Sequence, residues 1–382
     1  MKIRILLYFI SIFVLIGCKS QQLNKKIEGV WIFESKFNSL FIDDEDRLGG
    51  FTYPVIYDFQ KNKKLIFKHY GYKDFIHQWA LTNDSILTLD SLNYKVITLN
   101  DKTLTLLDQN NLDSHILFLH KPKEVRLDNS PEEISKILVE NNWFLNDSIN
   151  KNSDASFEFV DNGKMIYRYK IFDRSLKDTT YNIQIENWKI IEYKGYKLIA
   201  HIKEPNNDAY FNQINQILTI DSLSHTLLSS YRGIPSINSF SKKNFVNKKK
   251  KIEKLLIGKW IGYNSKEKTY GNYADNNSKR TALYEGNLTI EFNNSDMLIK
   301  LDSLNPYKYK WFVTKDGNTL IQENHIEDDL EKGSFFSAID LLQVSKDSIK
   351  ARFFNNYYFT SSRFDIPNLY YINLIQDLKR ID

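Results

Sequence analysis

Cys18 is the only cysteine in this chain of 382 residues, so the chain can form no internal disulfide. It follows a mostly apolar stretch of 13 residues, Ile5–Gly17, which is preceded by Lys2 and Arg4. A membrane-spanning helix needs about 20 apolar residues, so this run is too short to span a bilayer. A basic start, a short apolar run and a small residue before the cysteine are instead typical of an export signal.

The junction Leu15-Ile16-Gly17-Cys18 resembles the lipobox of bacterial lipoproteins. The resemblance implies that residues 1–17 are a cleaved signal peptide and that Cys18 carries a diacyl group on its sulfur. Two or more acyl chains hold a protein firmly on a bilayer, so we expect a membrane anchor at Cys18 and a tether over residues 18–26. In Gram-negative lipoproteins an aspartate after the cysteine marks inner-membrane retention, and Lys19 stands here instead. We therefore expect the outer membrane, and its periplasmic face because no acidic cluster follows.

A second set of residues open to covalent modification lies in six Asp-Ser-Ile/Leu tripeptides. Their hydroxyl groups belong to Ser85, Ser91, Ser148, Ser222, Ser303 and Ser348. The tripeptide resembles the O-glycan acceptor that some low-GC Gram-negative bacteria use on exported proteins, which would make these serines glycan acceptors. Alternatively, Asp-Ser forms a turn and the apolar residue begins the next strand.

The remaining polar residues do not form a pattern that indicates catalysis. No two of the seven histidines have metal-ligand helical spacing, and no phosphate loop, nucleophile elbow or cysteine–histidine pair is present. The formal charge of +5 falls to +3 without Lys2 and Arg4, which is too balanced to indicate a nucleic-acid partner. We expect no catalytic residue, no metal and no cofactor.

The six tryptophans form three pairs with internal separations of 48, 45 and 51 residues: Trp31 and Trp79, Trp143 and Trp188, Trp260 and Trp311. The leading tryptophans of the pairs lie 112 and 117 residues apart, which indicates a threefold internal repeat. With 23 Tyr and 25 Phe against 14 Gly and 7 Pro, the composition favours β-strands. We expect all six tryptophans to pack in cores.

The pattern between the tryptophans also repeats. Each copy carries an apolar residue, an acid and a phenylalanine: Tyr57-Asp58-Phe59, Phe157-Glu158-Phe159 and Ile290-Glu291-Phe292. An apolar pair begins six residues after each phenylalanine: Leu65-Ile66, Met165-Ile166 and Leu298-Ile299. Alternating runs joined by turn residues predict a β-hairpin in every copy.

Helices are expected only before the copies. Ser130-Pro131-Glu132-Glu133 is a capping box with proline at the first helical position, and it predicts a short helix. A shorter helix is expected over Ile252–Ile257. The segments Lys121–Asn129 and Lys242–Lys251 are predicted to be linkers.

The Gly-x-Trp openings Gly29-Val30-Trp31 and Gly258-Lys259-Trp260, each followed by a meander, resemble those of lipocalin-like domains. The resemblance implies an all-β fold of three consecutive small antiparallel meander barrels, each preceded by a short helix or linker. The repeats span residues 27–121, 131–243 and 251–382. In such folds the leading tryptophan closes one end of the barrel and a late arginine stacks on it; Arg232 and Arg352 are candidates for this arginine.

Three functions fit these expectations. The first is a lipid-anchored envelope protein that binds a small apolar molecule or an envelope component. The second is a structural or accessory subunit of an envelope protein complex. An exported hydrolase ranks last, because no catalytic motif supports it.

Overall fold

The structure of the chain is a computed structural model. It describes residues 23–38, 56–68, 74–82, 85–108, 115–146, 155–161, 163–173, 178–202, 211–231, 234–242, 246–264, 269–272, 286–302, 306–328, 331–359 and 368–381. Cys18 and the leader lie outside these ranges. Within them, no helix is both long and apolar enough to cross a membrane.

The first barrel follows a helical segment at residues 23–27 and has eight antiparallel strands in chain order. They are β1 (Gly29–Asn38), β2 (Ile56–Phe59), β3 (Lys64–Lys68), β4 (Phe75–Thr82), β5 (Ile86–Leu89), β6 (Leu92–Leu99), β7 (Thr103–Asp108) and β8 (His115–His120). The barrel closes because β1 also pairs with β8.

The second barrel follows helix α2 (Pro131–Glu140) and also closes with eight strands. They are β9 (Asn142–Leu145), β10 (Ser156–Phe159), β11 (Lys164–Asp173), β12 (Asp178–Tyr193), β13 (Tyr196–Ile202), β14 (Phe211–Ile220), β15 (Ser224–Tyr231) and β16 (Ile234–Lys242). The predicted capping box of α2 is confirmed: Glu133 N donates to Ser130 Oγ at 3.2 Å, and Ser130 N donates to Glu133 Oε2 at 2.8 Å.

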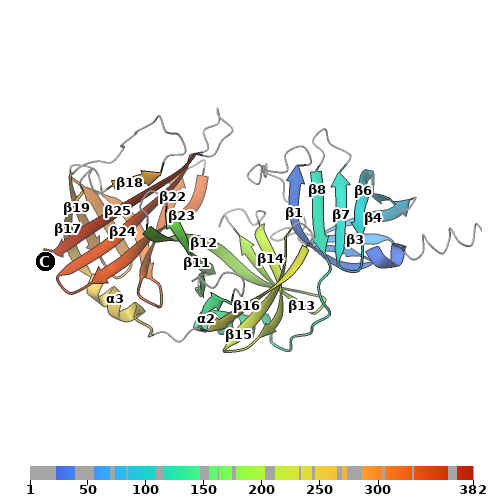
Figure 1. Cartoon of the computed structure of the whole chain (residues 1–382), viewed down its shortest axis with the longest axis horizontal. Coiled ribbons are helices and arrows are strands. Elements are labelled where there is room, and N and C mark those ends of the chain that lie inside the picture. Colours follow the sequence, from blue (N-terminus) through green and yellow to red (C-terminus); the bar gives the residue numbers. More distant parts are fainter. Residues whose placement is uncertain are drawn as a thin grey trace, which may run out of the picture. The chain divides into compact units, whose positions relative to one another are not determined.

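The third barrel follows helix α3 (Lys249–Leu256), which lies at one end of it (Figure 1). Its strands are β17 (Gly258–Asn264), β18 (Thr269–Asn272), β19 (Gly286–Phe292), β20 (Asp296–Leu301), β21 (Tyr307–Val313), β22 (Thr319–Asp328), β23 (Glu331–Val344), β24 (Ser348–Phe359) and β25 (Asn368–Arg380). Both β17 and the short β18 pair with β25, so the two together act as the first strand of an eight-stranded ring. The predicted class, three consecutive all-β meander barrels, is confirmed.

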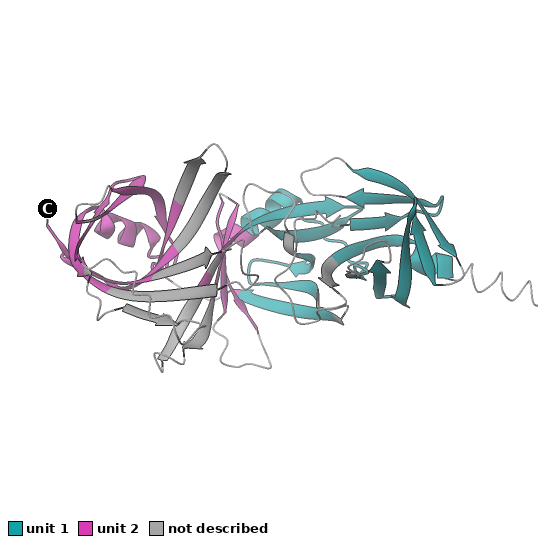
Figure 2. Ribbon diagram, turned by 90° about the horizontal axis from the view of Figure 1, so that it is seen from above, with its two compact units in different colours: residues 1–137, 187–241 teal, residues 138–186, 242–382 magenta. Residues whose placement is uncertain are grey.

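The chain divides into two compact units that do not follow the barrel boundaries (Figure 2). Unit 1 comprises residues 1–137 and 187–241, and unit 2 comprises residues 138–186 and 242–382. The division passes through the second barrel, because its early strands pack with the third barrel and its later strands pack with the first.

The three predicted hairpins are present as β2–β3, β10–β11 and β19–β20, but the third has a different register. In the first two, the partner of the phenylalanine lies six residues further on. Phe292 instead pairs with Met297, five residues on, because the turn is one residue shorter. Since side chains alternate between faces, Met297 is buried in the core and Leu298 lies on the outer face.

Candidate functional site

The sites predicted for covalent modification are only partly within the described residues. Cys18, Ser148 and Ser303 lie outside them. Of the other serines in the Asp-Ser tripeptides, Ser85 is half-buried, whereas Ser91, Ser222 and Ser348 are exposed.

The aspartates of these tripeptides have a structural role of their own. Asp90 Oδ1 accepts a hydrogen bond from Gln78 N at 2.7 Å, and its other oxygen lies 2.5 Å from His77 Nδ1. Asp221 Oδ1 accepts from two backbone amides of its own turn, at 2.6 and 2.7 Å. Asp302 Oδ1 accepts from Asn287 N at 2.9 Å. The turn interpretation therefore accounts for these aspartates without a glycan.

All six tryptophans are buried, and each of the leading three makes the same kind of hydrogen bond. In each barrel the indole Nε1 donates to a backbone carbonyl four or five residues earlier: Trp31 to Ile27 at 2.7 Å, Trp143 to Leu138 at 3.0 Å and Trp260 to Leu256 at 2.7 Å. The carbonyl lies in the segment before the first strand. The bond therefore ties each preceding segment to its barrel.

A cation lies over the leading tryptophan in two barrels, but it is not the residue that the sequence indicated. In the third barrel Arg380 stacks on Trp260, with Cζ 4.4 Å from the ring centroid, and it donates to the carbonyls of Ile257 and Leu255 at 3.0 and 2.7 Å. Arg352, the sequence-based candidate, lies on β24; burial raises the pKa of Asp340, and the charge of Arg352 partly opposes that rise. Arg232 lies outside the described residues.

The first barrel uses a lysine instead of an arginine. Lys121 Nζ lies 5.0 Å from the Trp31 ring centroid and donates to Lys26 O at 3.1 Å. Lys121 directly follows β8, the last strand of the first barrel, and Arg380 is the final residue of β25, the last strand of the third barrel. That position relative to the final strand, rather than residue type, is the signal by which the sequence could have revealed them.

The most extensive polar arrangements of the described residues form where consecutive barrels meet, once within each unit. In unit 1, Asp58 on β2 is almost fully buried, and it accepts a hydrogen bond from Tyr193 Oη at 2.8 Å. Lys194 Nζ lies 2.5 Å from the same carboxylate oxygen. Tyr193 ends β12 and Lys194 begins the β12–β13 turn, so this turn of the second barrel binds the acid of the first. Burial, followed by the bond to Asp58, raises the pKa of Tyr193.

Apolar and amide contacts surround this ion pair. One apolar cluster joins β1 and β2 to β13 and β14 through Val30, Ile32, Ile56, Leu198, Ala200 and Ile214. The fully buried side-chain amide of Gln216 makes two hydrogen bonds of 2.7 Å with the backbone N and O of Lys123. The first barrel and the β12–β14 strands therefore share a continuous packed surface.

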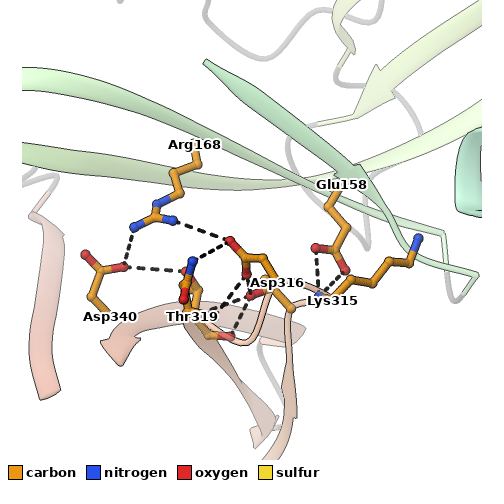
Figure 3. A network of polar contacts seen from close by, with 8 residues as sticks. Glu158, Arg168, Lys315, Asp316, Thr319 and Asp340 are labelled. Atoms are coloured by element: carbon orange, nitrogen blue, oxygen red, sulfur yellow. Dashed lines mark hydrogen bonds and ion pairs between the residues drawn. The ribbon is translucent and has the colours of Figure 1, made fainter. Parts of the chain in front are cut away.

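In unit 2 a second joint uses Glu158 on β10, the residue that corresponds to Asp58 in the repeat. Both carboxylate oxygens accept a hydrogen bond from Lys315 N at 3.1 Å (Figure 3). Lys315 Nζ donates to Val139 O. Burial raises the pKa of Glu158 to about 7, although the Lys315 amide opposes the shift. Burial likewise lowers the pKa of Lys315.

A second ion pair lies beside Glu158 in the same joint. Arg168 on β11 lies 3.4 Å from Asp340 of β23 and 3.7 Å from Asp316 of the β21–β22 turn (Figure 3). Burial raises the pKa of Asp340, and Arg168 opposes that shift. The apolar part of the joint consists of Val160, Ile166, Ile183, Ile321 and Ala338, with Ile185 and Phe312 at its edge.

The two joints are built in the same way. In each, the acid of the repeated triplet accepts hydrogen bonds from the turn between the fourth and fifth strands of the following barrel. That turn carries Lys194 in the second barrel and Lys315 in the third, and we call it the lysine turn. The sequence repeat identified the acid in each copy. It did not identify the partner of the acid, because the partner is more than 100 residues away in the chain.

Carboxyl groups with a shifted pKa often mark catalytic sites, and the pKa values of Glu158 and Asp340 are both raised. Both side chains are buried, and their oxygens are bonded to Lys315 and Arg168 respectively. Burial between two barrels is the main cause of both raised pKa values. Within the described ranges, no group of three or more His, Cys, Asp or Glu is placed to hold a metal ion.

No protein family model matches this chain, and no curated protein matches it. Among solved structures it is similar to transferrin binding protein B. A double mutant of that protein from Haemophilus parasuis Hp5 aligns with 11% identity and a TM-score of 0.20, over 83% of this chain and 64% of that chain. The isotype 1 protein of serogroup B Neisseria meningitidis aligns with 10% identity and a TM-score of 0.20, over 86% and 65%.

This chain therefore spans less than two thirds of the length of those proteins. At such TM-scores the likeness supports no inference about function. The fold rests on the strand pairing of the three barrels themselves.

Proposed function

We propose that this chain is an exported, lipid-anchored envelope protein whose barrels bind another envelope protein through their outer faces. The observation that carries the proposal is the way the barrels meet each other. Both joints use apolar and charged residues on the outside of the strands, while large side chains fill the inside.

The filled interior is clearest in the first barrel. Trp31, Phe59 and Trp79 pack there, and the Phe59 and Trp79 rings meet edge to face at 5.5 Å. Aliphatic side chains complete the cluster: Leu65, Leu87, Leu89, Leu104, Leu106, Leu117 and Leu119. The third barrel has an equivalent cluster in which Phe292 and Trp311 meet edge to face at 5.1 Å. This packing favours a protein partner over a small apolar molecule held inside a barrel.

The anchor in this proposal is a diacylated Cys18. Each acyl methylene contributes about 0.8 kcal/mol of membrane affinity, so two chains retain the protein on the bilayer. The tether expected over residues 18–26 is shorter than the sequence indicated, because residues 23–27 form the helical segment of the first barrel and Lys26 O accepts a hydrogen bond from Lys121. The proposed location is the periplasmic face of an outer membrane. Catalysis has no part in the proposal, because the described carboxyl groups with a raised pKa, those of Glu158 and Asp340, lie in the joint of unit 2.

The test is purification of the native protein from membranes with mild detergent, followed by mass spectrometry. We expect an acylated N-terminal peptide and a co-purifying protein in a fixed ratio. A Cys18→Ser variant should appear in the soluble envelope fraction with its barrels intact. A stoichiometric apolar small molecule without any protein partner would reject the proposal in favour of ligand transport, and an unmodified Cys18 would reject the anchor.

A further inference from the structure

We propose that the outer face of the third barrel around Glu291 is a docking site for a partner protein that presents a lysine-bearing β-turn. This inference rests on the proposed function and names the surface involved. It follows from comparing the two joints with the third copy of the same surface.

Three outer-face residues recur at matched positions in all three barrels. An acid on the second strand pairs with an aliphatic residue on the third strand, and a cation follows two residues later. The acid, aliphatic and cationic residues are Asp58, Ile66 and Lys68; Glu158, Ile166 and Arg168; and Glu291, Leu298 and Lys300. We call each set an acid site.

The first two acid sites are covered by the next barrel, whereas the third is open. Asp58 is 1% exposed and Glu158 is 7% exposed. At the third site Glu291 and Leu298 are half-buried, and Lys300 is exposed. Lys259, which pairs with Glu291 across the strands, is exposed as well. The third barrel thus carries the residues of a joint in an accessible state.

The occupied sites show which chemistry an acid site accepts. Asp58 forms an ion pair with the Lys194 ammonium and accepts a hydrogen bond from the Tyr193 hydroxyl. Glu158 accepts a hydrogen bond from the backbone N–H of Lys315. In both cases the donor lies on a lysine turn, between two strands whose aliphatic side chains complete the joint. In unit 2 an acid in the turn, Asp316, also meets the cation of the site. A matching partner carries a lysine turn with a neighbouring carboxylate that can meet Lys300 or Lys259.

A second copy of this chain fits the site less well. The first barrel offers the equivalent β4–β5 turn, and exposed Ile76 and Ile97 on β4 and β6 could supply apolar contact. In the sequence, the residues between β4 and β5 include the acid Asp84 and no lysine. Like charges at such a contact cost binding energy. Charge complementarity therefore favours a different protein.

The direct test supplies a lysine turn in trans to the whole protein. The probe is a backbone-cyclised, fluorescently labelled peptide with the sequence of residues 189–200, which contains the Lys194-Gly195 turn. Cyclisation is needed because an isolated two-stranded hairpin is only marginally stable in water. Fluorescence anisotropy measures its affinity for the wild-type chain, for Glu291→Lys and for the milder Glu291→Gln.

We expect saturable binding to the wild type and roughly thirtyfold weaker binding to Glu291→Lys, in keeping with the loss of one close charge pair. A peptide with glutamate in place of the turn lysine should fail on the wild type and recover on Glu291→Lys. The control variant Asp347→Lys makes the same charge reversal at an exposed turn of the third barrel and should bind like the wild type. Binding that ignores both charge reversals would overturn the docking site, as would a wild type that does not bind.

Native purification separates this inference from the proposed function. Loss of the co-purifying protein from Glu291→Lys but not from Asp347→Lys supports the docking site. A partner retained equally by both variants overturns the docking site and leaves the proposed function standing. Absence of any protein partner from the wild type rejects both. Self-association in sedimentation velocity that depends on Glu291 would instead assign the site to a second copy of the chain.

Discussion

At the scale of single residues, the same acid has three different environments in this protein. Asp58 and Glu158 are buried by the next barrel, whereas Glu291 is only half-buried. Burial disfavours the charged form of a carboxyl group, so the cost of each joint depends on how well the lysine turn compensates for lost water. Lys194 brings a charge to Asp58, whereas Lys315 brings an amide to Glu158.

The raised pKa of Glu158 predicts that the second joint weakens as the pH rises. The folded-state pKa is about 7 against an ordinary value of 4.5, so the folded protein holds the proton more tightly. The resulting stabilisation is complete below pH 4.5 and is lost as the pH rises to about 7; the shift corresponds to about 3 kcal/mol. Glu158→Gln keeps an acceptor for Lys315 N and should abolish this dependence. Urea unfolding from pH 5 to 8 measures the difference, with Glu291→Gln as the control.

His120 in the first barrel predicts the opposite pH dependence. It is 1% exposed, neither ring nitrogen has a hydrogen-bond partner among the described residues, and burial lowers its pKa to about 4. A histidine kept neutral by folding stabilises above its ordinary pKa of 6.5, and that contribution is lost as the pH falls to about 4.

The His120→Phe variant should therefore lose about 3 kcal/mol less of its free energy of unfolding than the wild type as the pH falls from 7 to 4. Thermal unfolding of the two proteins between pH 7 and 4 is the measurement. Parallel curves across that range would show that His120 does not titrate on unfolding.

At the scale of elements, each barrel is closed by a short segment tied to the leading tryptophan. Arg380 connects three parts of the third barrel. Its guanidinium donates to Leu255 O near the end of α3, stacks on Trp260 of β17, and donates to Lys346 O in the β23–β24 turn at 2.6 Å. A guanidinium is planar and has five N–H donors, so it can lie flat on the indole while it bonds several carbonyls; an ammonium is not planar and has three donors.

Replacing Arg380 by Ala should destabilise the protein by about 2–4 kcal/mol, since it removes three hydrogen bonds to backbone carbonyls and a cation–π contact. Arg380→Lys should recover less than half of the loss. The neighbouring exposed Lys379→Ala is the matched control and should stay within about 0.5 kcal/mol of the wild type. Equal midpoints of urea unfolding for the Ala, Lys and control variants would contradict this role.

At the scale of the whole molecule, stability within each unit depends on contacts between residues of different barrels. The coupling between Asp58 and Tyr193 can be isolated with a double-mutant cycle, because Tyr193→Phe removes only the hydroxyl. A hydrogen bond to a buried charge predicts a coupling energy of about 1.5–3 kcal/mol between Asp58→Ala and Tyr193→Phe. Tyr94→Phe, whose hydroxyl is influenced by Asp108 rather than Asp58, should show no coupling with Asp58→Ala. Chemical unfolding of the four variants in each cycle provides the values.

The amino-acid sequence alone determined the features that depend on neighbouring residues. The tryptophan pairs, the repeated acid-containing triplets, the hairpins and the capping box at Ser130 all come from spacing and turn chemistry within a few residues. The same local signals do not show that the turn of the third hairpin is one residue shorter, because a shorter turn leaves the apolar alternation almost unchanged around Met297.

Tertiary structure decided which outer faces meet. Outward-pointing acids carry no local signal of what covers them, so Glu158 and Glu291 look alike in the sequence and differ only after folding. The choice of Arg380 rather than Arg352 as the cation over Trp260 has the same origin, since it depends on where the last strand ends relative to the first. Contacts between residues more than 100 positions apart follow from barrel closure and packing, which no short stretch of sequence specifies.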